Sequence, residues 1–216
     1  MRRQFFRPAK SIFSMIAALF AVAMTLAVVP VAAQINSSDA TFNEAVQAVK
    51  DKNYRHAVKL FKMQAESDQH DAQFNLALLL QSGKGAPQDF LSAMIWAQSA
   101  QLGGIEAAEE LSEELAALLP DDAIETVRKA VRSRLETRIE NGDAAALTQF
   151  ATFHLTMLEE PDYETAYVWF SISAALGLDG ALAARDDARD NVEDEKIVAL
   201  QREAGTIYEK LNIKLD

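Results

Sequence analysis

Residues Ala93–Gly104 read AMIWAQSAQLGG, and the pattern returns at Ala166–Gly177 as AYVWFSISAALG. An alanine, a tryptophan and a glycine recur in the two stretches with an offset of 73 residues. The matched positions are Ala93, Trp96 and Gly104, then Ala166, Trp169 and Gly177. A helix-length segment that ends at glycine and recurs at a fixed offset is typical of α-helical repeat proteins.

The chain on either side of these stretches has the apolar periodicity of helices, and few glycines or prolines interrupt it. We expect Ile35–Asp39 to be a short polar leader and Thr41, with Glu44, to cap the first helix. The helices are expected in pairs, so the predicted fold class is an all-α solenoid of about five helical hairpins. The predicted hairpins are 40–66, 71–104, 105–140, 143–177 and 178–213.

The first copy of the pattern is the more complete one. It runs from Ala72 through Leu76, Ala77, Leu80, Gly83, Gly85, Asp89, Ala93, Trp96 and Ala100 to Gly104. This arrangement resembles a Sel-one-like repeat, a member of the tetratricopeptide-like superfamily, and Ala146–Gly177 resembles a second one. The second copy departs from the family pattern at His154 and at Met157, where a loop glycine is usual. The resemblance implies a right-handed α/α superhelix that acts as a protein-interaction scaffold.

The N-terminal 33 residues have the pattern of a secretory signal peptide. Four basic residues precede the uncharged apolar run Ser11–Val29, and Val31-Ala32-Ala33 forms a small-residue cleavage site before Gln34. The alternative is an uncleaved membrane anchor, since the apolar run is close to the ~20 residues that a span needs. Both readings place a single domain, 34–216, outside the cytoplasm, with a bacterial periplasm as the simplest compartment.

Removal of that segment would leave a strongly acidic chain. Residues 34–216 hold 17 Lys and Arg against 32 Asp and Glu, which gives a net charge of −15. Nucleic acids and anionic membrane surfaces are therefore poor partners, and a basic protein or cationic ligand would be attracted. The sequence has no cysteine, which excludes disulfides, thiol catalysis and cysteine-ligated zinc.

No residue pattern predicts a cofactor, a metal or a catalytic centre. The three histidines, His56, His70 and His154, lack the spacing of metal ligands. Paired carboxylates are expected on exposed helix faces or at helix starts, where they complement the helix dipole. These pairs are Glu109-Glu110, Asp121-Asp122, Glu159-Glu160 and Asp186-Asp187. A glycoside hydrolase or a calcium site could also be built from such pairs.

Two sets of repeat positions are distinguished. The predicted repeat core is Ala72, Leu76, Ala93, Trp96, Ala100, Gly104, Ala146, Phe150, Ala166, Trp169 and Gly177. The predicted partner-binding stripe, on the first helix of each repeat, is Asp71, Phe74, Leu78, Gln81, Thr148, Thr152 and Leu155. The apolar side chains of Phe74 and Leu78 are open to two interpretations: they hold a peptide or helix, or they contact the N-terminal hairpin.

The favoured hypothesis is a secreted, non-enzymatic scaffold that binds another protein as adaptor or regulator. The alternative is a carbohydrate-binding protein or hydrolase of the cell envelope that uses the acidic pairs. A third possibility is a structural role in a homo-oligomer. The sequence does not identify the partner, the pathway or the oligomeric state.

Overall fold

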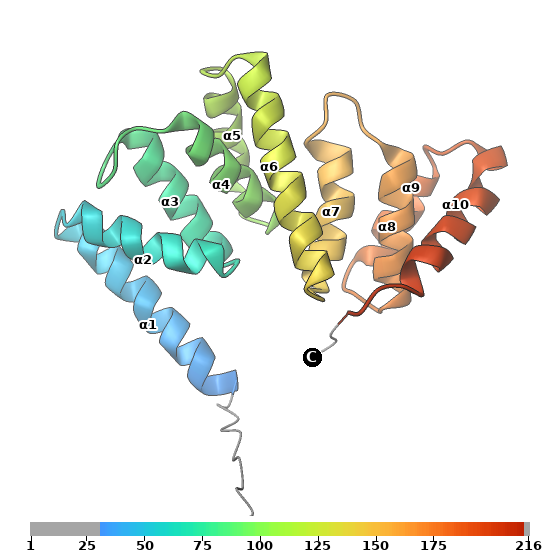
Figure 1. The fold of residues 1–216 in the computed structure, drawn as a ribbon, viewed down its shortest axis with the longest axis horizontal. Helices are drawn as coiled ribbons and strands as arrows, with labels where there is room; N and C mark the ends of the chain where they lie inside the picture. The colour runs from blue at the N-terminus through green and yellow to red at the C-terminus, as the bar shows by residue number, and fades with distance from the viewer. Residues whose placement is uncertain (1–30, 214–216) are drawn as a thin grey trace, which may run out of the picture.

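A computed structural model describes residues 31–213, and these residues form ten α-helices and no strand. The helices follow one another along an arc, from α1 and α2 at one end to α9 and α10 at the other (Figure 1). The prediction of an all-α solenoid is therefore confirmed. The helices are α1 Val31–Lys50, α2 Tyr54–Glu66, α3 His70–Ser82, α4 Phe90–Leu102, α5 Ala107–Ala116, α6 Asp121–Glu140, α7 Ala145–Thr156, α8 Tyr163–Ala175, α9 Ala181–Arg189 and α10 Asp194–Tyr208.

The first helix differs from the sequence-based expectation. Helix α1 begins at Val31, so the predicted polar leader Ile35–Asp39 is helical and Thr41 lies inside the helix instead of capping it. The capping-box pattern alone could not reveal this, because a helix can also continue through such a motif. The predicted apolar signal run lies outside the described residues. Within residues 31–213, no helix is both long enough and apolar enough to cross a membrane.

The two tryptophan-bearing helices are the centres of two similar four-helix units. Helix α4 packs against α3, α5 and α6, and α8 packs against α7, α9 and α10. Helices α5 and α6 pack more closely on α4 than on each other, and α9 and α10 do the same on α8. The contact between α6 and α7 joins the two units, and α1 and α2 come before the first unit. The 73-residue offset thus corresponds to a unit of four helices.

Equivalent loops enter the two tryptophan helices. Asp89 accepts a hydrogen bond from the backbone N–H of Ser92 at 3.0 Å, and Asp162 accepts one from Thr165 at 3.0 Å. Each carboxylate therefore caps its helix. The first loop needs Gly85, which has φ +84° and lies where a Cβ would collide with the backbone of Tyr54. The second loop has the same cap without a glycine.

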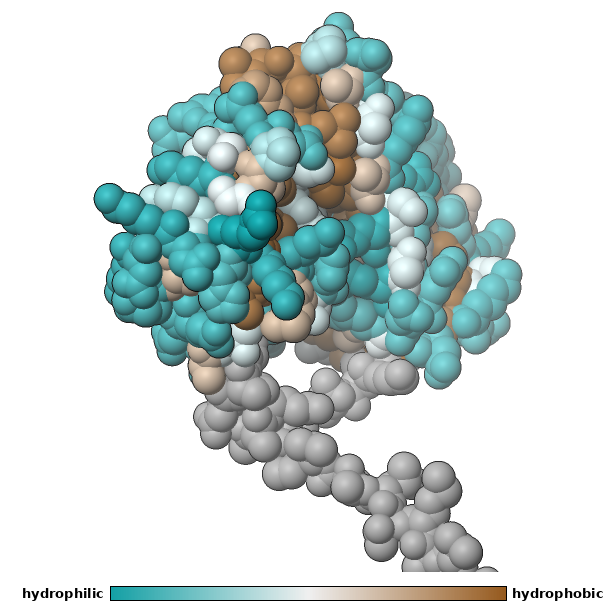
Figure 2. All heavy atoms as spheres, turned by 60° about the vertical axis from the view of Figure 1, so that its left-hand side comes forward, coloured by the Kyte–Doolittle hydropathy of each residue, from teal (hydrophilic) through white to brown (hydrophobic). Residues whose placement is uncertain are grey.

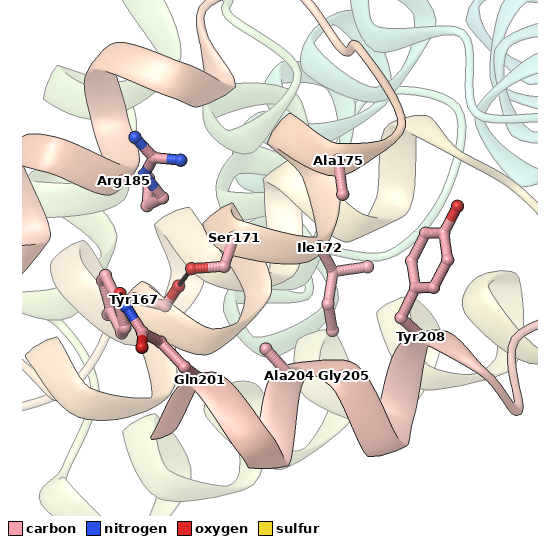
Figure 3. Close-up of a pocket in the computed structure, with 9 residues that line it drawn as sticks. All are labelled: Tyr167, Ser171, Ile172, Ala175, Arg185, Gln201, Ala204, Gly205 and Tyr208. Atoms are coloured by element: carbon pink, nitrogen blue, oxygen red, sulfur yellow. Dashed lines mark hydrogen bonds between the residues drawn. The ribbon is translucent and has the colours of Figure 1, made fainter. Parts of the chain in front are cut away.

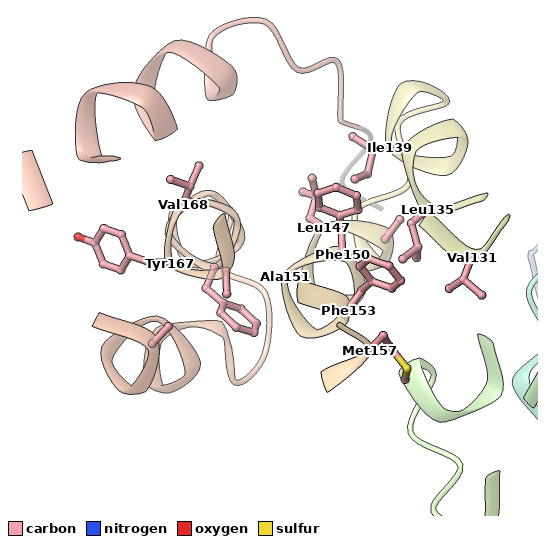
Figure 4. Close-up of a cluster of buried hydrophobic side chains, with 14 of the residues drawn as sticks. Val131, Leu135, Ile139, Leu147, Phe150, Ala151, Phe153, Met157, Tyr167 and Val168 are labelled. Carbon is pink, nitrogen blue, oxygen red and sulfur yellow. The ribbon is translucent and has the colours of Figure 1, made fainter. Parts of the chain in front are cut away.

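The apolar core is divided into two clusters. The smaller cluster joins α1, α2 and α3 around Phe61 and Leu76. The larger one runs from α3 to α10. Figure 4 shows part of it, where Val131 and Leu135 of α6 lie near Phe150 and Phe153 of α7. Trp96 packs against both clusters, so this side chain joins the two parts of the core.

A polar cluster around Asp68 also fastens the N-terminal helices to the rest. Asp68, in the loop between α2 and α3, forms ion pairs with Arg134 at 2.7 Å and Arg138 at 3.0 Å, both from α6. Arg138 also contacts Gln149 of α7, which lies 3.3 Å from His70 at the start of α3. These side chains come from four separate elements, so the cluster fixes the orientation of α2 and α3 relative to α6 and α7.

Candidate partner-binding grooves

The predicted core positions fall into three groups. The alanines, Leu76 and Phe150 are at most 4% exposed. Trp96 and Trp169 are only partly buried, although both pack against the core. Gly104 and Gly177 are exposed, with φ of +88° and +74°, so they allow the turns after α4 and α8 instead of packing inside. Repeat periodicity locates such positions but does not distinguish packing from turn formation.

The predicted partner-binding stripe does not form one surface. On α3, Asp71 is exposed, Leu78 is 38% exposed, and Gln81 donates a hydrogen bond to Glu114 of α5 at 3.2 Å. Phe74 is partly buried and packs against the larger core cluster. On α7, Thr148, Thr152 and Leu155 are partly buried, and Leu155 packs against the larger cluster.

The face that carries the N-terminal helices is mostly hydrophilic. A band of hydrophobic side chains runs up through it (Figure 2). Leu78 is among the large apolar residues that remain exposed, together with Met63, Leu118, Leu182, Val198 and Tyr208. These residues belong to four different helices and one loop, so their exposure alone does not define a binding site.

A groove between α6, α7, α8 and α10 is lined by aromatic, charged and aliphatic side chains. Its volume is about 450 Å³, and each helix lines it with residues three or four positions apart, which lie on one helix face. We call it the Trp169 groove. It is lined by Arg132, Glu136, Ile139, Glu140, Phe150, His154, Asp162, Thr165, Trp169, Glu203 and Ile207.

Three aromatic rings make one wall of the Trp169 groove. The ring of Phe150 lies edge-on to Trp169, with centroids 5.0 Å apart, and 4.8 Å from the ring of His154. The Arg132 guanidinium lies 6.0 Å from the centroid of Phe150 and forms an ion pair with Glu136 at 2.8 Å. Since these contacts fix the neighbouring rings, the partly buried face of Trp169 is held at a defined place.

His154 and Asp162 form a polar pair within this groove. His154 is 5% exposed, and its Nδ1 lies 3.2 Å from Asp162 Oδ2. Burial lowers the pKa of His154, although the carboxylate of Asp162 opposes that effect. Burial works to raise the pKa of Asp162, but hydrogen bonds from Thr165 and the contact with His154 lower it overall. The neutral imidazole therefore donates from Nδ1, and its buried Nε2 has no partner among the described residues.

The groove is predominantly anionic. One arginine faces four carboxylates, those of Glu136, Glu140, Asp162 and Glu203. Glu140 and Glu203 form no ion pair with any residue in 31–213, whereas Glu136 and Asp162 have the partners given above. The field inside the groove is therefore suited to a cation that also presents a flat or apolar surface to the aromatic wall.

A second groove, of about 320 Å³, lies between α8, α9 and α10. Its polar groups are largely engaged with one another: Ser171 donates to the Tyr167 carbonyl at 2.7 Å and Gln201 donates to the Tyr167 hydroxyl at 3.3 Å (Figure 3). Arg185, also in the lining, pairs with Asp186 at 2.6 Å. This groove has fewer unmet polar groups than the Trp169 groove.

The acidic pairs named from the sequence do not converge. Glu109-Glu110 and Asp121-Asp122 lie in the first turns of α5 and α6, and Asp186-Asp187 lies on α9. Glu159-Glu160 lies in the loop before α8. Within residues 31–213, no group of three histidine or acidic side chains could hold a metal ion.

The sequence analysis missed most of the Trp169 groove. Glu136, Glu140, Glu203 and Ile207 were not selected, because they lie on the helices that follow the repeat motif. One available signal was their spacing: Glu136 and Glu140, like Glu203 and Ile207, are four residues apart and share a helix face.

Successive helices in two similar four-helix units, a core shared between these units and open grooves define an α-helical repeat protein. The family model for the Sel1 repeat matches residues 49–68, 70–100 and 153–178. The chain therefore carries Sel1 repeats, as the tryptophan motif predicted. Proteins built from this repeat generally serve as helical scaffolds for protein–protein interaction.

The solved structures that are similar to the chain include two helical-repeat proteins. One is a protective antigen present in uropathogenic Escherichia coli strains that displays an SLR fold, with 19% identity and a TM-score of 0.36 over 85% of this chain. The chain spans 35% of the length of that protein. The other is a Sel1 repeat protein from Oxalobacter formigenes, with 22% identity, a TM-score of 0.38, and coverage of 82% of this chain and 76% of that one. A search of curated proteins gave no match.

Proposed function

We propose that this chain is a secreted protein of the bacterial periplasm that binds another protein as adaptor or regulator and carries out no chemistry itself. The observation that carries the proposal is the Trp169 groove, in which four helices hold aromatic, acidic and unpaired polar groups together. Such a mixture of apolar and charged groups on rigid elements suits recognition of a polypeptide segment. The N-terminal charge and apolar pattern supports secretion.

The proposal assigns residues 34–216 to one binding domain, preceded by a cleaved signal peptide. The exposed part of the predicted stripe, Asp71 and Leu78, is a second candidate contact surface. The alternative function, carbohydrate binding in the cell envelope, has one observation in its favour. Trp169 is partly buried and lines a groove with carboxylates, and both side-chain types can contact sugars.

Co-purification after brief crosslinking in the native envelope tests the proposed function. We expect one envelope protein to be enriched with the wild-type chain and depleted when Glu203 is changed to lysine. Leu78→Glu is the comparison for the α3 surface, and Leu182→Glu, on exposed α9, is the matched control. Absence of any specific protein, with retention on cell-wall oligosaccharides instead, would favour the carbohydrate-binding alternative. The double variant Asp186→Ala and Asp187→Ala is expected to leave capture intact.

A further inference from the structure

The first four-helix unit shows how the tryptophan of this repeat can hold an arginine. The guanidinium of Arg134 on α6 lies 4.8 Å from the ring centroid of Trp96 on α4. The same guanidinium donates to the carbonyl of Ala65 at 2.8 Å and to Asp68 at 2.7 Å. The arginine therefore stacks on the indole and donates hydrogen bonds at its edge to oxygen atoms of the preceding turn.

The second unit has the same frame but lacks that arginine. Helix α10 begins 73 residues after α6, and Trp169 follows Trp96 by the same offset, so Ile207 occupies the position of Arg134. Ile207 and Trp169 both line the Trp169 groove. No cation lies over the indole of Trp169 among the described residues, whereas Arg134 covers that of Trp96.

The groups around Trp169 are suited to the missing cation. Glu140 and Glu203 line the groove without an ionic partner in residues 31–213. Nε2 of His154, whose side chain is 6% exposed, has no hydrogen-bond partner within residues 31–213. Because Nδ1 faces Asp162, Nε2 of the neutral ring is an acceptor and needs an N–H donor.

We propose that the Trp169 groove binds an arginine side chain of a partner protein, stacked on Trp169 as Arg134 is stacked on Trp96. The inference deepens the proposed protein-binding function and rests on it. A guanidinium is preferred to a lysine ammonium, because it is flat enough to stack on the indole and has five N–H donors for separated acceptors. A neutral sugar would leave the charges of Glu140 and Glu203 uncompensated.

A titration with defined peptides tests the proposal. The probe is acetyl-Ala-Leu-Arg-Leu-Ala-amide, compared with peptides that carry lysine, citrulline or glutamate in place of arginine. Citrulline keeps the shape of arginine and removes its charge. Trp96→Phe leaves Trp169 as the only tryptophan, so its fluorescence reports on the groove. Calorimetry on the wild-type chain provides a second measurement, should the Trp96 variant fold poorly.

The expected result is binding of the arginine peptide with a change in Trp169 fluorescence. The citrulline peptide should bind at least about tenfold more weakly, as expected when a cation–π contact and charged hydrogen bonds are lost. Glu203→Gln and Glu140→Gln should each weaken binding several-fold. Glu195→Gln, an exposed carboxylate of α10 outside the groove, should have no effect.

A self-blocking variant makes the test sharper. Ile207→Arg recreates in the second unit the arginine that the first unit already has, and should abolish peptide binding. Val198→Arg adds the same charge to α10 at a residue 54% exposed and outside the groove, and should leave binding unchanged. If Ile207→Arg does not fold, the double variant Glu140→Gln and Glu203→Gln, at two exposed positions, replaces it.

Several results would overturn the inference. The first two are equal affinity for the arginine and citrulline peptides, and peptide binding to the Ile207→Arg variant as tight as to the wild-type chain. The others are displacement of the peptide by an oligosaccharide, and a Trp169 fluorescence signal that changes with protein concentration alone. The last would mean that a second copy fills the groove. If the peptide fails to bind while envelope capture still enriches one protein, the arginine assignment is wrong and the proposed function stands. Failure of capture alone would contradict the proposed function.

Discussion

Asp68 is the residue whose loss should most clearly separate the N-terminal helices from the rest of the chain. We predict that Asp68→Asn destabilises the fold, because it removes the charge that pairs with Arg134 and Arg138. The substitution is chosen to keep the backbone, since Asp68 has φ +59° and asparagine tolerates this conformation. The two arginines would then lie near each other without their shared carboxylate.

The magnitude follows from the burial of the three side chains. Asp68, Arg134 and Arg138 are 23%, 24% and 13% exposed, so the ion pairs are partly shielded from solvent. A hydrogen bond to a charged group contributes about 1.5–3 kcal/mol. Two such bonds are weakened, while asparagine still accepts one and solvent reaches part of the cluster, so we expect a loss of about 2–3 kcal/mol.

Urea unfolding of the wild-type chain and the variant measures this loss directly. For a chain of this length it corresponds to a decrease in Tm of about 4–12 °C. Asp186→Asn is the matched control, because its partner Arg185 is adjacent and Asp186 is 62% exposed. The control should cost less than about 1 kcal/mol. A loss below about 0.5 kcal/mol for Asp68→Asn would refute the idea that this cluster fastens α2 and α3 to α6.

Three further predictions concern the two tryptophans, His154 and the N-terminal segment. Trp96→Ala should cost about 3 kcal/mol and Trp169→Ala about 2 kcal/mol in urea unfolding, because both are partly buried but only Trp96 packs against two core clusters; equal losses would contradict this difference. Burial lowers the pKa of His154, so the unfolded chain binds more protons below pH 6.5 and stability should fall as the pH decreases through that range. His154→Gln should reduce this dependence in urea midpoints measured at several pH values; an unchanged slope would exclude the contribution. The intact mass of protein from the native envelope should correspond to a chain that begins at Gln34, and retention of residues 1–33 would instead support an uncleaved anchor.

The sequence predicts the helical frame because the frame depends on local chemistry. Asp89 and Asp162 cap their helices where a side-chain acceptor is expected, and the exposed glycines Gly104 and Gly177 follow the helices that they end. The repeated alanines allow close helix approach and are buried for that reason. Each of these features depends on neighbouring residues or on a fixed periodicity.

The Trp169 groove and the Asp68 cluster depend on distant residues, so periodicity does not predict them. Asp68 meets Arg134 across 66 positions, and the Trp169 groove joins side chains from Arg132 to Ile207. The partial burial of both tryptophans has the same origin, because it is set by helices α6 and α10, which follow the repeat motif. A comparison of Arg134 with Ile207 at the 73-residue offset could have indicated that the two units differ there.

Site-specific photo-crosslinking in the native envelope tests the central claim, that the Trp169 groove binds a protein. A benzoylphenylalanine at Ile207 places the crosslinker in the groove, and the same residue at Val198 places it on α10 outside the groove. We predict one crosslinked partner from position 207, none from position 198, and loss of the adduct when Glu203 is also changed to lysine. The same adducts from both positions, or none from position 207, would contradict the account.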